Sequence, residues 1–342
     1  MIKINEEIQL DFADVFLYPQ YSEVVSRKLA NTGTSVLGFI NLEVPVCSAN
    51  MDTITDGKMA LAMYKAGAIG AIHRFTSIED AVKEYRIVAS EAGKCFVSVG
   101  VQADAMERTR ALFDAGARYF IVDIAHGHSK MMKDMLGWMR DKYGKAIYIM
   151  AGNVATRLGA YDLFSWGANA VKIGIGPGGV CCTKNVTGVT RPQWSAIKDV
   201  CEAREDLCPL KQRHDWLVGK DFVFVADGGI REIGDIAKAV AAGADLVMMG
   251  KMLSTALETP GPRVNGKKIY RGMASKDSML SIRDSSTLPT PEGISTIIDE
   301  KEEPVEEIIK RIRGGLQSSM SYSNASTIEQ FKQHAMFGIR RR

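Results

Sequence analysis

Two adjacent cysteines follow a glycine-rich stretch near the middle of the chain, Gly174-Ile-Gly-Pro-Gly-Gly-Val-Cys-Cys-Thr183. Glycines let the backbone approach a ligand closely and can present N–H groups to an anion such as phosphate. The same dipoles favour a thiolate, which would make a neighbouring cysteine a nucleophile. The alternatives are a plain turn, small packing residues at Cys181 or Cys182, and a disulfide between these two neighbours.

Acidic and glycine residues also meet where two later apolar runs end. One run ends in Asp227-Gly228-Gly229, and the next ends in Gly250-Lys251. A carboxylate at a strand end can accept both hydroxyls of a ribose, and glycine N–H groups at a helix start can bind phosphate. Together they predict a nucleoside monophosphate ligand. A helix N-cap is the structural alternative for Asp227.

A third candidate group is Asp123-Ile-Ala-His-Gly-His-Ser129. The His-Gly-His spacing can bind a metal, but no third and fourth ligands are evident in the sequence. We therefore expect Asp123 to contact a substrate or cofactor, or to cap a helix. For His73, which ends another apolar run, we expect a structural hydrogen bond.

The elements that must position these groups are eight short apolar runs. Because the runs are continuous rather than alternating, they predict strands buried on both faces of a parallel sheet. Helical patterns lie between them, and eight strand–helix units predict a closed (β/α)8 TIM barrel, with an open doubly wound sheet as the alternative. The runs are Val44–Ser48, Ile69–His73, Phe96–Val99, Tyr119–Asp123, Ile147–Gly152, Ala170–Ile175, Phe222–Asp227 and Leu246–Gly250.

The connections between the runs carry further signals. Glycines at 67, 116, 167 and 243 each stand just before a run and predict the left-handed end of a helix. The sixth and seventh runs start 52 residues apart, which predicts an active-site loop after strand six. After strand eight we predict a hairpin turning at Asn265-Gly266 and a flap over Ser275–Pro291. Helices are then expected at Pro304–Ile312 and Ala325–His334.

The composition fits an ordinary folded protein. The chain has 342 residues, of which 46% are hydrophobic and 24% charged, with a net charge of +3 and six cysteines. The weak positive charge argues against nucleic-acid binding, and no apolar run is long enough to cross a membrane. The N-terminal stretch lacks a signal-peptide core, and the cysteines form neither a disulfide scaffold nor a zinc motif. We therefore expect a cytoplasmic protein.

Seven motifs follow one another along the chain: VPVCSANMDT (44–53), DIAHGHS (123–129), AGNVAT (151–156), GIGPGGVCCTK (174–184), ADGGI (226–230), YRGMAS (270–275) and TPEG (290–293). In this order they resemble the IMP dehydrogenase/GMP reductase family, from about Ile8 to Phe337. The resemblance implies a single (β/α)8 barrel domain over 1–342 without an inserted regulatory domain. It also implies a homo-oligomer, typically a tetramer, that acts on a purine nucleoside monophosphate.

The resemblance also assigns roles to single residues. Cys181 is the implied nucleophile that attacks C2 of the purine, while Thr183 and Glu292 handle the leaving or entering group. The remaining implied roles are Asp227 for the ribose; Gly228, Gly229 and Gly250 for the phosphate; Met51, Gly272 and Met273 for the base; Asp123 and Asn153 for the nicotinamide cofactor; and Gly176, Gly178 and Cys181 as a candidate monovalent-cation site, with potassium as the ion.

Two reactions of the family compete. The dehydrogenase passes hydride from IMP to NAD and then hydrolyses a thioimidate with an Arg-Tyr pair on a long flap. The reductase releases ammonia from GMP and then receives hydride from NADPH. Only 19 positions separate Met273 from Glu292, without an Arg-Tyr pair, which favours the NADPH-dependent GMP reductase. The phrases AIHRF and LQSSMSYSNAS favour it as well, whereas YRGM and ETPG also resemble the dehydrogenase.

Two residues depart from the family pattern at the phosphate. Gly179 stands where many relatives have serine, and Lys251 where they have serine or glycine. A lysine could replace the lost hydroxyl with a charge-assisted contact, so Lys251 joins the predicted substrate-binding residues. The alternatives are a lysine that points into solvent and an altered nucleotide. A nucleotide-sensing barrel is a further alternative, although binding alone would not require Cys181.

Overall fold

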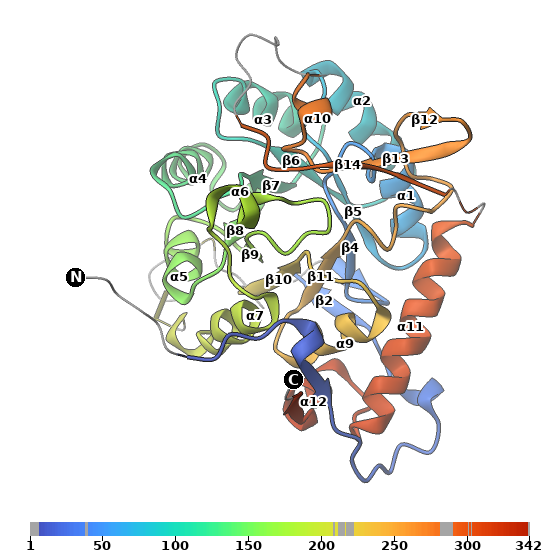
Figure 1. The fold of residues 1–342 in the computed structure, drawn as a ribbon. Coiled ribbons are helices and arrows are strands. Elements are labelled where there is room, and N and C mark those ends of the chain that lie inside the picture. Colours follow the sequence, from blue (N-terminus) through green and yellow to red (C-terminus); the bar gives the residue numbers. More distant parts are fainter. Residues whose placement is uncertain are drawn as a thin grey trace.

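The computed structural model of the chain describes residues 7–37, 40–207, 209, 210, 216, 222–280, 290–299, 301 and 303–340. At its centre eight parallel strands close into a barrel in the order β10-β11-β4-β5-β6-β7-β8-β9. Helices surround these strands (Figure 1). The predicted (β/α)8 barrel is confirmed, and the open doubly wound sheet is excluded because every barrel strand pairs on both sides.

All eight apolar runs form barrel strands, as predicted. Their side chains are almost entirely buried, because each strand has the barrel interior on one face and helices on the other. The strands are β4 (Val46–Ser48), β5 (Ile69–Ile72), β6 (Cys95–Val99), β7 (Tyr119–Asp123), β8 (Tyr148–Val154), β9 (Ala170–Ile173), β10 (Val223–Asp227) and β11 (Leu246–Met249).

The side chains of each strand alternate between the two faces. Ile121, Ala170 and Val225 belong to an apolar cluster inside the barrel. Their neighbours Phe120 and Val171 belong to the larger cluster between the strands and the helices. The interior of the barrel is therefore a packed core, and only its ends can hold a ligand.

Helices connect the strands and cover the outside of the barrel. Four of them begin at a side chain that accepts a hydrogen bond from a free backbone N–H group, which stabilises the helix start. These caps are Asp56, Ser77, Ser129 and Thr156. The connecting helices are α1 (Gly57–Lys65), α2 (Ile78–Ala89), α3 (Ala105–Asp114), α4 (Lys130–Tyr143), α5 (Arg157–Ser165), α7 (Gln193–Glu202), α9 (Ile233–Ala241) and α11 (Val305–Tyr322).

The four predicted glycine joints lie at helix ends. Gly67, Gly116, Gly167 and Gly243 have φ of +78°, +109°, +125° and +114°. L-residues with side chains rarely adopt these values, so glycine is required where α1, α3, α5 and α9 turn into the next strand. This prediction is confirmed.

Both long connections lie where the sequence predicts them. The segment after β9 contains the short helix α6 (Thr183–Thr187) before α7. The segment after β11 forms a three-stranded sheet of β12 (Arg263–Val264), β13 (Lys267–Arg271) and β14 (Ser295–Ile298). Asn265 and Gly266 have φ of +51° and +74° between β12 and β13, as a two-residue hairpin turn requires. The predicted hairpin is confirmed.

The chain ends extend the barrel. An antiparallel pair joins β1 (Val15–Leu17) to β15 (Phe337–Ile339). A hairpin of β2 (Thr34–Val36) and β3 (Ile40–Leu42) adds apolar side chains to the interior cluster. Helix α12 (Ile328–His334) lies within the predicted range Ala325–His334.

Helix α11 is longer than the sequence pattern suggests. It continues from the predicted end at Ile312 to Tyr322, because Leu316 and Met320 extend its buried apolar stripe. The pair Gly314-Gly315 obscures this stripe in the sequence. A Cβ at Gly315 would lie 2.3 Å from a methyl of Ile233, so the glycine permits close packing of α11 on α9.

The predicted flap falls partly outside the described residues. Within Ser275–Pro291, helix α10 covers Lys276–Leu280, whereas residues 281–289 are not among the described residues. The flap over this segment stays a prediction. Among the helices of the described part of the chain, none combines the length and apolar character needed to cross a membrane.

The glycine joints give a test of the fold. A Cβ at Gly243 would lie 2.7 Å from the Cβ of Cys201 at a positive φ, so Gly243→Ala should lower the free energy of unfolding by roughly 2–3 kcal/mol. Gly234→Ala is the matched control on α9, where nothing lies within 4 Å of the added Cβ. It should be neutral or stabilising. Urea denaturation measures both, and equal effects would refute the account of the joints.

Candidate active site

Three charged side chains stand at the carboxyl ends of β7, β9 and β10. Each occupies an inward-facing position, two residues after a member of the interior apolar cluster. The Lys172 ammonium lies 2.7 Å from an oxygen of Asp123 and 3.2 Å from Oδ2 of Asp227. Lys172 is 2% exposed, so its charge is compensated by protein groups and not by water.

The register of the sheet explains why Lys172 lies beside Asp123. Asp123 pairs with Gly152 on β8, and Gly152 pairs with Lys172 on β9, so the three residues lie level across the barrel. A Cβ at Gly152 would lie 2.6 Å from the Cβ of Lys172. The glycine thus leaves the space in which the lysine side chain crosses the top of the core.

The ionisation of this cluster follows from its charges. Burial by itself would lower the pKa of Lys172, but the two carboxylates outweigh it and raise the pKa above its usual range. Burial would raise the pKa of Asp123, but Lys172 and Arg74 outweigh that effect and lower it. The cluster is therefore held as an ammonium between carboxylates at neutral pH.

Asn153 joins the charged cluster to the loop that carries the two cysteines. Its amide donates hydrogen bonds of 2.8 Å to Oδ2 of Asp227 and to the carbonyl oxygen of Gly174. The predicted cofactor residue Asn153 and ribose residue Asp227 are thus direct neighbours. Asp227 is not a helix N-cap, because α9 starts after Glu232. Within the described residues no hydrogen bond reaches Oδ1 of Asp227, which leaves this oxygen for a ligand.

The thiol of Cys181 lies in a tight turn of the loop after β9. Its backbone N–H donates to the carbonyl of Gly178 at 3.1 Å, and its Sγ lies 3.2 Å from the hydroxyl oxygen of Thr183. Both Cys181 and Cys182 are partly exposed and carry free thiols, so the alternative of a disulfide between them is excluded. The predicted nucleophile therefore stands at the open end of the barrel and not in the core.

Glu292 reaches the same loop through the backbone. Its carbonyl accepts a hydrogen bond of 2.7 Å from the N–H of Cys182, and its own N–H donates to Ala274 at 3.0 Å. Gly293 forms a bridge with Cys181. The structure thus brings Thr183 and Glu292 together around Cys181. Among the described residues, however, the Glu292 side chain makes no hydrogen bond with Thr183.

The predicted phosphate glycines lie in the two loops after β10 and β11, next to the cysteine loop. Gly228 and Gly229 have φ of +86° and +78°, and a Cβ at either would lie within 3.3 Å of Pro177 in the cysteine loop. A Cβ at Gly250 would lie 3.1 Å from the hydroxyl of Tyr270. Bare backbone therefore lines this part of the barrel mouth, as close approach of an anion requires.

The residues assigned to the base also lie near one another. The Sδ of Met273 accepts a hydrogen bond of 3.2 Å from the N–H of Asp52, next to Met51. Arg271 donates to the Asp52 carboxylate at 2.9 Å and so fixes β13 against the loop after β4. A Cβ at Gly272 would lie 2.8 Å from the carbonyl oxygen of Val180, beside the cysteine loop.

Three residues of this site escape the sequence analysis. Lys172 could have been recognised as the one charged residue in the otherwise apolar run Ala170–Ile175. Arg74 extends from the loop after β5 to within 3.8 Å of Asp123, and among the described residues its buried Nε has no hydrogen-bond partner. Tyr270 lies in the YRGM motif, and burial raises the pKa of its hydroxyl to about 12. Neither Arg74 nor Tyr270 stands in a spacing of residue types that would predict its role.

His73 behaves as predicted, with a structural hydrogen bond. Its Nδ1 accepts from the N–H of Phe75 at 3.1 Å, and burial lowers the pKa of the ring. Neither ring of the His-Gly-His motif lies in a metal cluster, since no group of three His, Cys, Asp or Glu in the described ranges could hold a metal ion. The potassium site at Gly176, Gly178 and Cys181 stays a prediction.

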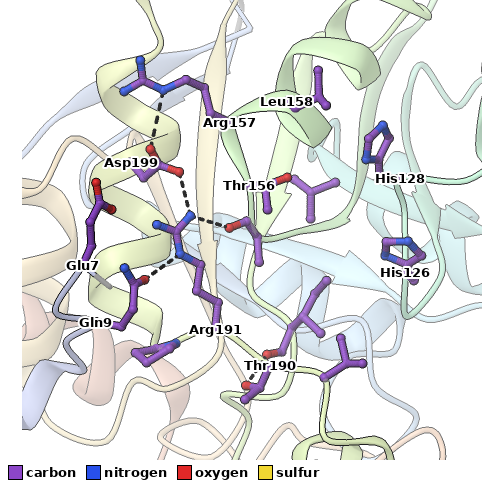
Figure 2. Close-up of a pocket in the computed structure, with 15 residues that line it drawn as sticks. Glu7, Gln9, His126, His128, Thr156, Arg157, Leu158, Thr190, Arg191 and Asp199 are labelled. Atoms are coloured by element: carbon purple, nitrogen blue, oxygen red, sulfur yellow. Dashed lines mark hydrogen bonds and ion pairs between the residues drawn. The ribbon is translucent and has the colours of Figure 1, made fainter. Parts of the chain in front are cut away.

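A pocket of about 680 Å³ lies beside this site, between the loops after β7, β8 and β9. Figure 2 shows His126 and His128 on one side and the paired side chains of Arg191 and Asp199 on the other. Asp123 ends β7 and Asn153 lies near the end of β8, and the loops after these strands line this pocket. Neither these two nor the other predicted site residues line it themselves. The predicted site and the pocket are therefore neighbours and not one cavity.

Comparisons with known proteins agree with this geometry. The model of the IMP dehydrogenase / GMP reductase domain matches residues 9–341. This chain belongs to that family. Its members are oxidoreductases of purine nucleoside monophosphates that use a nicotinamide cofactor.

Individual relatives have two different names. The inosine-5'-monophosphate dehydrogenase of Borreliella burgdorferi is 32% identical over 98% of this chain and 94% of its own length. The GMP reductase of Leishmania major is 28% identical over 96% of this chain and 94% of its own. An inosine-5'-monophosphate dehydrogenase of Chlorobaculum tepidum is 40% identical over 70% of this chain and 49% of its own. The family is thus shown, and the choice between the two reactions stays open.

Lys172→Met tests the charged cluster. It leaves two partly buried carboxylates without their shared cation and should cost about 3–5 kcal/mol of unfolding free energy at pH 7. In the folded protein the pKa of Asp123 is lowered, so the ionised carboxylate stabilises the wild type at neutral pH. This stabilisation is lost as the pH falls through the pKa that Asp123 has in the folded protein. The deficit of the variant should therefore narrow below about pH 4.

Chemical denaturation from pH 7 to pH 3 measures this difference. Lys198→Met is the control, because that lysine is 48% exposed in an i,i+4 pair with Glu202. Its effect should stay within about 0.5 kcal/mol. A pH-independent deficit for Lys172→Met would contradict the assigned charges.

Proposed function

We propose that the protein is a GMP reductase, which converts GMP to IMP and ammonia with NADPH through a covalent bond between Cys181 and purine C2. The observation that carries this proposal is the Cys181 thiol, partly exposed at the mouth of the barrel and 3.2 Å from the Thr183 hydroxyl. Nucleotide binding alone needs no such thiol, so this arrangement favours an enzyme over a nucleotide sensor.

In the proposed cycle the Cys181 thiolate adds to C2 of GMP. A neutral purine is a poor electrophile, so a proton must reach the ring or the amino group as the bond forms. Glu292 and Thr183 move this proton, and the amino group leaves as ammonia. Cys181 then carries a flat, electron-poor thioimidate. When hydride adds at C2, the C–S bond breaks, the electron pair returns to sulfur and IMP is released.

The cofactor would lie over the Asp123–Asn153 side of the site. NADPH supplies, when bound, the hydride that adds to C2. The residues present fit a polar ligand here, because the buried Arg74 Nε lies near Asp123 and lacks a hydrogen-bond partner in the described part of the chain. Asp227, with its free Oδ1, holds the ribose of the substrate. Met51, Gly272 and Met273 position its base, and Gly228, Gly229, Gly250 and Lys251 hold its phosphate.

The preference for the reductase rests on the short segment between Met273 and Glu292. A hydrolysing enzyme must admit and activate water after hydride transfer, and this segment of 19 positions contains no Arg-Tyr pair for that step. IMP dehydrogenase acting with NAD is the second candidate. It is favoured by the name of the relative that is 32% identical over 98% of this chain.

We further propose a single barrel domain that forms homo-tetramers in the cytoplasm. Connections of ordinary length support the absence of an inserted regulatory domain: only α2 lies between β5 and β6, and only α3 between β6 and β7. The five described cysteines carry free thiols, which suits a reducing compartment. Potassium is proposed to bind the loop at Gly176, Gly178 and Cys181.

An assay with two substrate pairs tests the reaction. With GMP and NADPH, absorbance of the reduced nicotinamide should fall and one ammonia should appear for each cofactor oxidised. With IMP and NAD, absorbance should stay flat. A rise with IMP and NAD, together with no change for GMP, would replace the reductase by the dehydrogenase. NADH in place of NADPH measures the cofactor preference.

Substitution of the two neighbouring thiols tests the nucleophile. Cys181→Ala should lower kcat by at least about 10⁴-fold, because it removes the thiolate that forms the covalent bond in the proposed cycle, while GMP still binds. Cys182→Ala is the matched control one residue away, and it should keep most of the activity. Retained turnover in Cys181→Ala, or equal losses in both variants, would reject the assignment.

A further inference from the structure

Gln193 is a buried polar side chain that has no role in the proposed cycle. It is the first residue of helix α7 and is fully buried. Its amide Nε2 donates hydrogen bonds to the carbonyl oxygens of Ile173 at 2.8 Å and of Asp227 at 3.1 Å. Because Ile173 ends β9 and Asp227 ends β10, the glutamine connects the ends of two neighbouring barrel strands.

The two strands separate at the level of this amide. Their parallel pairing ends at Ile173 and Ala226, and the cysteine loop leaves β9 at Gly174. The residues that follow still touch, because a Cβ at Gly174 would lie 2.2 Å from the carbonyl oxygen of Asp227. The backbone pairing of β9 and β10 no longer holds this contact, so side chains must maintain it.

Two side-chain amides hold Gly174 against Asp227. The Asn153 amide binds the carbonyl oxygen of Gly174 and the carboxylate of Asp227. The Gln193 amide binds the carbonyl of Asp227, and its Nε2 lies 2.9 Å from the position of a Cβ at Gly174. The base of the cysteine loop and the residue proposed to hold the ribose are therefore linked by one amide through the carboxylate and by the other through the backbone.

The backbone that carries Gln193 is itself fixed by the N-terminal segment. The N–H of Gln193 donates to Oδ1 of Asp11 at 2.8 Å, and Ser195 forms two hydrogen bonds with the backbone of Leu10. The N-cap residue of α7, Pro192, makes no side-chain capping bond. Because Asp11 binds a free N–H at the helix start in its place, Gln193 extends from a fixed backbone.

A side chain that only filled this space could be apolar. The Oε1 of Gln193 is buried and has no hydrogen-bond partner among the described residues. Leaving a buried acceptor unpaired costs free energy, which an apolar side chain of similar size would avoid. The contribution of the glutamine therefore lies in its two donated bonds, at the base of the cysteine loop.

We propose that Gln193 is a positioning residue, whose amide fixes the cysteine loop against Asp227 and so sets the distance between the Cys181 thiol and the bound nucleotide. This inference rests on the proposed function and adds a residue to it. Gln193 is buried and acts through the backbone without touching the substrate. Since a misplacement of about 1 Å can lower a rate by roughly 10²-fold, loss of the amide should slow bond formation more than it weakens nucleotide binding.

Kinetics with GMP and NADPH, together with titration calorimetry of GMP, test this role. Gln193→Met keeps the length of the side chain and removes both donated bonds. It should lower kcat by about 10- to 100-fold, while the Kd for GMP changes by less than about threefold. Gln317→Met is the matched control, because the amide of Gln317 on α11 also donates to a backbone carbonyl, that of Ala30. It should leave both quantities unchanged.

Gln193→Glu separates positioning from a general loss of stability. Burial favours the neutral form of the introduced carboxyl, which can donate one hydrogen bond, whereas the ionised form only accepts. At about pH 6 the kcat of this variant should therefore lie between those of wild type and Gln193→Met. A kcat of Gln193→Met within about threefold of wild type, or equal kcat values for the two variants at that pH, would overturn the inference.

Hydrogen exchange tests the same link without any turnover. Backbone amides of residues 174–183 should exchange about 10-fold faster in Gln193→Met than in wild type, and at the wild-type rate in Gln317→Met. Unchanged exchange in Gln193→Met rejects the positioning role and leaves the reductase standing. A wild type that turns over IMP with NAD but not GMP rejects only the reductase, and the same kcat ratios are then measured with IMP.

Discussion

The site depends on one buried ammonium held between two carboxylates. Lys172 lies at an inward-facing position of β9, where a barrel strand normally carries an apolar residue. It contacts Asp123 of β7 and Asp227 of β10, two strands that lie on either side of β9 in the barrel. Burying a charge is tolerable only with such partners. Because Asn153 also binds Asp227, the groups proposed for cofactor and ribose belong to one hydrogen-bonded unit. Their relative positions are therefore fixed before any ligand binds, which lowers the entropic cost of arranging two reactants.

The thiol is positioned by different means. Cys181 is held by a backbone turn and by contacts with the segment around Glu292 and Gly293, whereas Asn153 of the charged unit binds the start of the same loop at Gly174. The site therefore combines a charged unit on the ends of the barrel strands with a nucleophile in a loop. Such a division suits a reaction in which one sulfur must bond to the substrate and later release it, while the ribose and cofactor stay in place.

Sequence alone predicts most of this architecture, for reasons that differ between elements. The barrel strands are continuous apolar runs, and the joints such as Gly243 need a positive φ, so local chemistry identifies both. Lys172 escapes prediction because its partners are distant in sequence and meet only through the register of β7, β8 and β9. The extent of α11 is obscured by Gly314-Gly315, of which Gly315 permits close packing on α9.

The central claim is that Cys181 bonds to the purine ring, and an intact-protein mass spectrum tests it most directly. The wild-type enzyme is mixed with GMP without reduced cofactor and quenched in acid. We expect a species heavier by GMP less ammonia, with the added mass located on the peptide that contains Cys181 and absent from Cys181→Ala. No adduct under conditions that support turnover once NADPH is added, or an adduct on Cys182 instead, would contradict the account.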